Sequence, residues 1–173
     1  MAYHDALTDL PNRARLAERI QHAMLQCQRG SGTSLGVCCL DLDGFKAAND
    51  RWGHAVGDQL LCQVAQRLNA STRGEDTVAR FGGDEFVILL SDLKDEDDGI
   101  ETMTRLMKRI AIPFEIGNIR ESLTVSVGMT IYPGDAADDP DTLLRHADHA
   151  MYEAKRNGKN RLFLFDRDSE QRQ

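Results

Sequence analysis

Runs of apolar residues with the length of strands recur along the chain. Residues 34–42 are apolar at successive positions until Asp41 interrupts the run, and such a run is typical of a central strand that is covered on both faces. Shorter runs of strand character stand at 77–79, 87–90, 113–116, 123–131 and 161–165. The pattern therefore predicts a sheet built around one long, buried strand.

Segments with helical spacing separate these strands. Leu16, Ile20 and Met24 recur on one face of a helix that ends near residues 30–32, as expected for an amphipathic helix. Further helices are predicted at 44–53, from 57 to 68, at 100–110 and from 139 to 158, and residues 91–98 are predicted to form an acidic loop. Asp58 is positioned to cap the helix that begins at 57, and Asp139, followed by a proline, caps the last one. Helices mixed with strands indicate an α+β sandwich.

Two adjacent glycines, Gly82 and Gly83, connect the strand runs at 77–79 and 87–90. Glycine accepts the positive φ that a tight turn requires, so the pair predicts a β-hairpin. The carboxylates of Asp84 and Glu85 would then lie at or beside the hairpin tip, where the missing glycine side chains let a flat or phosphorylated ligand approach the backbone. A solvated turn that carries two acids is the alternative interpretation.

Asp41 is a second candidate for a ligand-binding acid. An acid at the end of a buried strand is costly unless it is paired or bound to a metal ion. The alternative is that Asp41 caps the following helix, although Asp43 fits that capping role better. The residues alone therefore leave a ligand site and a helix cap open.

Composition and charge limit the class of protein. A length of 173 residues fits one domain. The formal charge of −7 argues against a protein that follows nucleic-acid phosphates, which would need a basic stripe. No apolar segment approaches membrane-spanning length, no signal-peptide core is present, and the cysteines have no C-x-x-C or metal-ligand spacing. We expect a cytoplasmic domain with free thiols that binds neither nucleic acid nor a membrane.

Several motifs at compatible spacing resemble one family. The sequence Gly82-Gly83-Asp84-Glu85-Phe86 is letter for letter the signature of the GGDEF domains, the diguanylate cyclases of bacterial second-messenger signalling. Residues 5–13 are similar to the D-x-L-T-x-L-x-N-R start of that family, residues 41–58 to its D-x-D-x-F-K…N-D…G-H…G-D block, and residues 147–160 to its A-D-x-A-M-Y-x-A-K motif. The resemblance extends from about residue 5 to residue 165.

The resemblance implies a fold and a domain organisation. The expected fold is the ferredoxin-like palm of nucleotidyl cyclases, with a central, mostly antiparallel sheet flanked by helices. Residues 1–173 would form a single GGDEF domain with a core at about 5–165, and 166–173 would be a polar tail or the start of a linker. Relatives of this kind usually follow an upstream sensory domain, and many carry a C-terminal EAL phosphodiesterase domain, so we expect a domain of a larger signalling protein.

The resemblance also assigns roles to residues. Mg²⁺ or Mn²⁺ would be bound by Asp41, the carbonyl of Leu42, Asp84 and Glu85. Asp84 and Glu85 are the catalytic candidates, and which of them assists deprotonation stays open. Phosphates would be bound by Phe45 (through its backbone), Lys46, Lys155 and Lys159, and guanine by Asn49, Asp58 and, more weakly, His54. Arg73 and Asp76 match the R-x-x-D motif at which cyclic di-GMP inhibits such enzymes.

The activity implied by the resemblance is the condensation of two GTP molecules into cyclic di-GMP and two pyrophosphates. Each domain would bind one GTP, so turnover would require a homodimer. Two alternatives from other classes stay open. One is a GTP-binding regulatory domain without turnover that controls a fused phosphodiesterase, and the other is a cyclic di-GMP receptor that works through Arg73 and Asp76.

Overall fold

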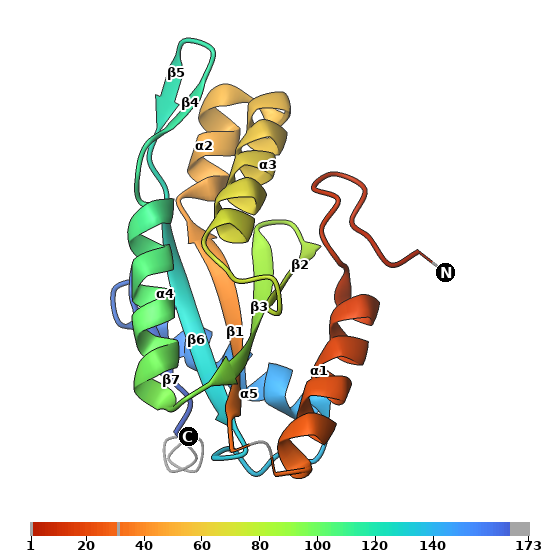
Figure 1. Ribbon diagram of the computed structural model, residues 1–173. Helices are drawn as coiled ribbons and strands as arrows, with labels where there is room; N and C mark the ends of the chain where they lie inside the picture. Colours follow the sequence, from red (N-terminus) through yellow and green to blue (C-terminus); the bar gives the residue numbers. More distant parts are fainter. Residues whose placement is uncertain (1, 31, 167–173) are drawn as a thin grey trace.

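The computed structural model describes residues 2–30 and 32–166, which form one layered α+β structure (Figure 1). The elements in chain order are α1 (Arg13–Gln28), β1 (Ser34–Asp43), α2 (Phe45–Trp52), α3 (His54–Ala70), β2 (Thr77–Gly82), β3 (Glu85–Leu93), α4 (Glu96–Ile110), β4 (Phe114–Ile116), β5 (Ile119–Glu121), β6 (Thr124–Tyr132), α5 (Pro140–Arg156) and β7 (Leu162–Leu164). Among the described residues, no helix combines the length and the apolar character needed to cross a membrane. The predicted tail at 166–173 lies almost entirely outside the described residues.

The main sheet has the strand order β2-β3-β1-β6-β7. All neighbouring strands are antiparallel except β6 and β7, which are parallel. β1 lies in the middle and pairs with β3 and β6 along most of its length, so its side chains are buried on both faces. This position explains the continuous apolar run at 34–42 and confirms the mostly antiparallel sheet of the expected fold.

Helices cover both faces of the sheet (Figure 1). On one face Leu40 and Ile88 belong to a core that includes residues of α3 and α4. On the other face Val37 and Val87 pack with residues of α1 and α5. The approach of α5 to the sheet requires Gly128, because a Cβ atom there would lie 2.0 Å from the backbone nitrogen of Met151.

Four local predictions differ from the structure. α3 begins directly after Gly53, whose φ of 91° ends α2, so Asp58 lies inside the helix and is not its cap. Asp43 does not cap α2, because the cap position is Gly44 and no side chain bonds there. The acidic stretch 91–98 is not a loop: β3 extends to Leu93, and Asp95 caps α4 by accepting a hydrogen bond from the Asp98 amide. The short strand β5, which pairs with β4, was not predicted.

Candidate active site

The acids of the hairpin lie beside Asp41 at one end of β1. Asp41 is the direct cross-strand partner of Glu85, so their side chains project from the same face of the sheet. The Leu42 amide donates a 3.3 Å hydrogen bond to the Asp84 carbonyl. Gly82 pairs with Glu85, so the turn consists of Gly83 and Asp84 and not of the glycine pair as predicted. The structure therefore brings together the predicted metal-binding and catalytic acids.

Arg80 fixes this turn. Its Nε and Nη2 atoms donate to the Gly83 carbonyl at 3.1 and 2.9 Å, and its Nη1 atom donates to the Asp5 carboxylate at 2.9 Å. The Asp5 carboxylate also accepts hydrogen bonds from the amide and the hydroxyl of Thr8. The sequence reasoning assigned no role to Arg80 or Asp5, although the matched D-x-L-T motif contains Asp5. The N-terminal segment is thus bonded to the turn that carries Asp84.

The surroundings of the hairpin acids favour their protonated forms. Burial raises the pKa of Asp84, and the nearby negative charge of Asp43 raises it further. Burial also raises the pKa of Glu85, and so do the charges of Asp148 and Asp84, although Arg13 opposes them. Groups whose pKa is shifted by burial and by like charges are common at catalytic sites. A cation placed among these acids would remove part of the repulsion.

Asp41 is paired on one side only. Its Oδ2 atom accepts a hydrogen bond from Lys155 on α5, whereas its buried Oδ1 atom has no hydrogen-bond partner. Among the described residues, no group of three or more His, Cys, Asp or Glu side chains is already arranged around a metal position. The donors nevertheless fit Mg²⁺ or Mn²⁺, because carboxylate and carbonyl oxygens are the ligands such ions prefer and one buried carboxylate oxygen lacks a partner. The metal ligands stay a prediction.

The predicted guanine-binding residues lie where α2 and α3 meet. The Asn49 Nδ2 atom lies 3.2 Å from the His54 Nδ1 atom, and the buried Asn49 Oδ1 atom has no hydrogen-bond partner. Asp58 is exposed on α3 and lines a pocket of about 280 Å³ together with Leu7. Leu7 belongs to the N-terminal segment, to which the sequence analysis assigned no role in the guanine site. The structure thus gathers Asn49 and His54, with Asp58 about one turn further along α3.

Replacing Gly57 with alanine is expected to weaken guanine-nucleotide binding about tenfold or more while the domain stays folded. The new Cβ atom would lie 1.9 Å from the Asn49 Oδ1 atom, so the amide must move. Alanine also favours a helix over glycine by about 1 kcal/mol, which supports the fold. Calorimetric titration with a non-cleavable GTP analogue and thermal unfolding would separate the two effects. Unchanged affinity in a folded Gly57→Ala variant would contradict the role of Asn49.

The predicted phosphate-binding residues occupy different positions. Phe45 is the first residue of α2 and its ring is buried, whereas Lys46 is exposed. Lys155 is bonded to Asp41, and its pKa is lowered by burial and by the nearby charge of Lys159. Lys159 lies in the turn between α5 and β7 with a φ of 62°. The Lys155 ammonium therefore lies against Asp41, and Lys159 follows in the turn after α5.

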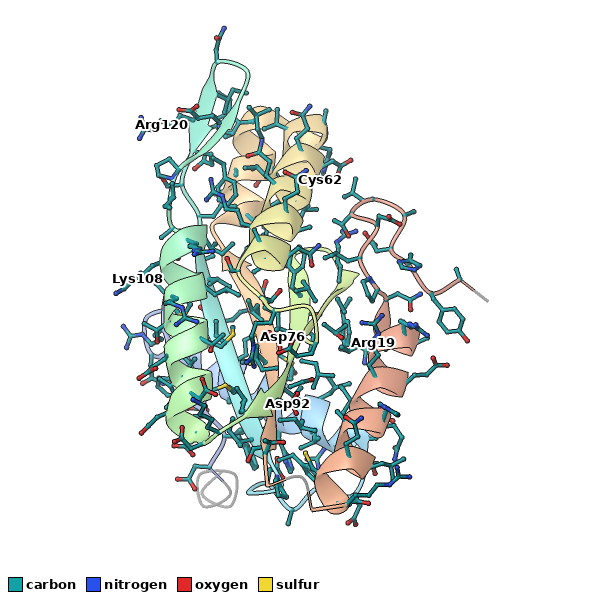
Figure 2. All side chains as sticks on the ribbon, viewed as in Figure 1. Arg19, Cys62, Asp76, Asp92, Lys108 and Arg120 are labelled. Atoms are coloured by element: carbon teal, nitrogen blue, oxygen red, sulfur yellow. The ribbon has the colours of Figure 1, made fainter. Side chains whose placement is uncertain are left out.

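Arg73 and Asp76 of the predicted inhibitory site are in contact. The buried Asp76 carboxylate accepts hydrogen bonds from the amides of Arg73 and Ser91, at 2.9 and 3.0 Å. The half-exposed Arg73 side chain donates to the Ser91 carbonyl and forms an ion pair with Glu75. Figure 2 shows Asp76 beside the sheet, well away from Arg120 on the β4–β5 hairpin. The Asp76 carboxylate therefore stabilises the loop before β2. Of these two side chains, only that of Arg73 is exposed to solvent over a large part of its surface.

Comparisons with known proteins show which family the chain belongs to. A family model described as "Diguanylate cyclase, GGDEF domain" matches residues 2–161. The Pseudomonas aeruginosa protein MucR, a bifunctional diguanylate cyclase/cyclic di-GMP phosphodiesterase, is 42% identical over 166 residues. The match covers 96% of this chain and 24% of MucR, so the chain spans about a quarter of that relative.

Solved structures of two GGDEF domains have the same fold. The GGDEF domain of TpbB (YfiN) from Pseudomonas aeruginosa superimposes with a TM-score of 0.92 at 36% identity, and 97% of each chain is covered. The GGDEF domain of DgcB from Caulobacter crescentus, solved in complex with cyclic di-GMP, gives a TM-score of 0.84 at 29% identity and covers 95% of this chain and 96% of that domain. The chain belongs to the GGDEF-domain family of diguanylate cyclases.

Proposed function

We propose that this chain is a catalytically competent diguanylate cyclase that condenses two GTP molecules into cyclic di-GMP and two pyrophosphates. The observation that carries the proposal is the convergence of acids with a lysine. Asp41 faces Glu85 across the strand pair, Asp84 follows in the adjoining turn, and Lys155 binds one oxygen of Asp41 while the other oxygen has no partner. Acids that can bind a divalent cation, next to cationic groups for phosphates, are the requirements of metal-assisted phosphoryl transfer.

The reaction consists of two equivalent displacements. The 3′-oxygen of one GTP forms a bond to the α-phosphorus of the other, the bond from that phosphorus to pyrophosphate breaks, and the hydroxyl proton passes to a base. Asp84 or Glu85 would accept this proton, since both lie at the hairpin turn beside Asp41. Bound Mg²⁺ or Mn²⁺ would neutralise the triphosphate. Lys155 and Lys159 would hold phosphate oxygens, and Arg80 would keep the turn with Asp84 in place.

The proposal includes a homodimer, because one domain binds one GTP and the attacking hydroxyl belongs to the opposing nucleotide. It also includes product inhibition through the exposed part of Arg73, for which the cyclic di-GMP bound in the DgcB structure is the supporting observation. In the full protein, an upstream sensory domain and an EAL domain would control the formation of the homodimer. The relative MucR, which is named as both a diguanylate cyclase and a cyclic di-GMP phosphodiesterase, supports the phosphodiesterase part of this organisation.

The experiment that tests the proposal uses the chain at high micromolar concentration with GTP and Mg²⁺, followed by chromatography of the nucleotides. Cyclic di-GMP should form with the wild type and be lost in the Asp84→Ala variant, and the rate should rise more steeply than the protein concentration. A rate proportional to protein concentration would contradict the dimer. GTP binding without product, even after dimerisation is forced by a fused coiled coil, would instead indicate a regulatory domain.

A further inference from the structure

Asp43, at the end of β1, uses both carboxylate oxygens in hydrogen bonds. Its Oδ1 atom accepts from the Ser126 hydroxyl at 2.7 Å. Its Oδ2 atom accepts from the Thr124 hydroxyl at 2.8 Å and from the backbone amide of Asn160 at 3.0 Å. Ser126 and Thr124 belong to the neighbouring strand β6, whereas Asn160 lies in the turn between α5 and β7. Asp43 therefore connects the edge of the active site to a turn that is remote in the sequence.

That turn has a strained backbone. Lys159 and Asn160 are consecutive residues other than glycine with positive φ, at 62° and 47°. The left-handed region is unfavourable for a residue other than glycine, although less so for asparagine, and such a conformation persists only where the surroundings enforce it. Here the Asn160 amide donates to Asp43, the Lys159 amide donates to the Ala154 carbonyl at 3.0 Å, and the Arg161 side chain donates to the Lys159 carbonyl. Strain that is enforced in this way is often found beside a functional residue.

Lys159 is that residue. Its charge acts on Lys155, which is itself bonded to Asp41. Lys155 therefore lies beside the acid of β1, and Lys159 follows it in the strained turn after α5. The backbone of the strained turn sets the position from which the Lys159 side chain extends. Asp43 accepts a hydrogen bond from the amide of the next residue, Asn160.

We propose that Asp43 is a positioning residue that holds the turn at residues 158–160 in its strained form and thereby directs the Lys159 ammonium toward the nucleotide triphosphate. The inference rests on the proposed function, because it presupposes that GTP binds here. It assigns Asp43 to the turn and not to a helix cap, since both of its oxygens accept hydrogen bonds from β6 and from the turn.

The test measures binding and local structure in the whole chain. Asp43→Asn, Lys159→Ala and the double variant are titrated by calorimetry with a GTP analogue that has a methylene bridge between the α- and β-phosphorus atoms, in the presence of Mg²⁺. Each single variant should bind about tenfold to a hundredfold more weakly, the effect of one charge-assisted contact. The double variant should bind no more weakly than Lys159→Ala, because Asp43 acts through Lys159. Hydrogen exchange of the Asn160 amide should be at least about tenfold faster in Asp43→Asn, because its acceptor is weakened.

Asp135→Asn is the matched control. The Asp135 carboxylate also accepts a hydrogen bond from a hydroxyl of β6, that of Thr130, at 2.6 Å. Thr130 lies near the end of β6 opposite to Thr124. Its replacement should leave both nucleotide affinity and Asn160 exchange unchanged. If Asp43→Asn alone fails to fold, the same titrations are made with Asn160→Gly in every protein, since glycine accepts the positive φ without strain, and hydrogen exchange follows the amide of residue 160.

The proposal would be overturned if the losses of affinity in the two single variants multiply in the double variant, or if Asn160 exchange is unchanged in Asp43→Asn. It would also be overturned by an altered Mg²⁺ requirement in Asp43→Asn, which would make Asp43 a metal ligand. If the wild type does not bind the analogue, the proposed function fails together with the inference. If the wild type binds and Asp43→Asn binds equally well, only the inference fails.

Discussion

Replacing Asp41 with alanine is expected to reduce cyclic di-GMP formation about a thousandfold or more without a comparable loss of stability. Asp41 is the acid at the centre of the proposed site, where it lies opposite Glu85 and binds Lys155. Its charge is buried, and one of its oxygens has no hydrogen-bond partner. Removing the side chain therefore also removes an unfavourable buried charge, and the partly exposed Lys155 can turn its ammonium toward water.

Product chromatography and urea unfolding would measure the two effects separately. The free energy of unfolding of Asp41→Ala should stay within about 1 kcal/mol of the wild-type value. Lys155→Ala should be the more destabilising change, because it leaves the buried carboxylate without a countercharge, and added Mg²⁺ should restore part of the loss. Glu101→Ala removes an acid from the exposed face of α4 and should change neither quantity. A loss of cyclase activity in Asp41→Ala of less than about tenfold would remove Asp41 from the catalytic site.

Replacing Arg67 with alanine is expected to lower the free energy of unfolding by about 2–4 kcal/mol. The Arg67 guanidinium, which extends from α3, stacks on the Phe114 ring at 3.6 Å from its centroid. It also donates to the backbone carbonyls that end α4 and begin the next segment, namely those of Arg109, Ile110, Ile112 and Pro113. The last carbonyls of a helix have no partners within the helix. Arg67 supplies a donor for two of them, those of Arg109 and Ile110, and for two carbonyls beyond the helix.

Thermal and urea unfolding would test this expectation. The melting temperature should fall by about 5–15 °C. Arg67→Lys should recover only a small part of the loss, because an ammonium group cannot reproduce a planar fork of donors. Arg105→Ala, which removes an exposed arginine from α4, should change the free energy of unfolding by less than about 0.5 kcal/mol. A loss in Arg67→Ala no larger than that of Arg105→Ala would show that these carbonyls are satisfied by water instead.

Much of the fold could be predicted from the sequence because it depends on local patterns. The continuous apolar run at 34–42 predicted the central strand, and the glycine pair predicted the hairpin. Asp139 followed by Pro140 predicted the start of α5, where the Asp139 side chain accepts from the Thr142 amide. Where a local signal was ambiguous the prediction was wrong, as for Asp58, which could cap a helix but lies inside one because α3 starts immediately after Gly53.

The residue types of the site could also be predicted, because an acid at the end of a buried strand and acids at a hairpin turn are unusual in themselves. The partners of these residues were decided by the tertiary structure alone. Pairing of β1 with β3 placed Asp41 opposite Glu85, and the packing of α5 on the sheet brought Lys155 to Asp41. Asp43 shows the difference most clearly, since the local pattern favoured a helix cap whereas its hydrogen bonds reach Thr124, Ser126 and Asn160. Local patterns thus determine which elements form and which acids stand out, whereas contacts between residues far apart in the sequence exist only once the sheet register and the helix packing are established.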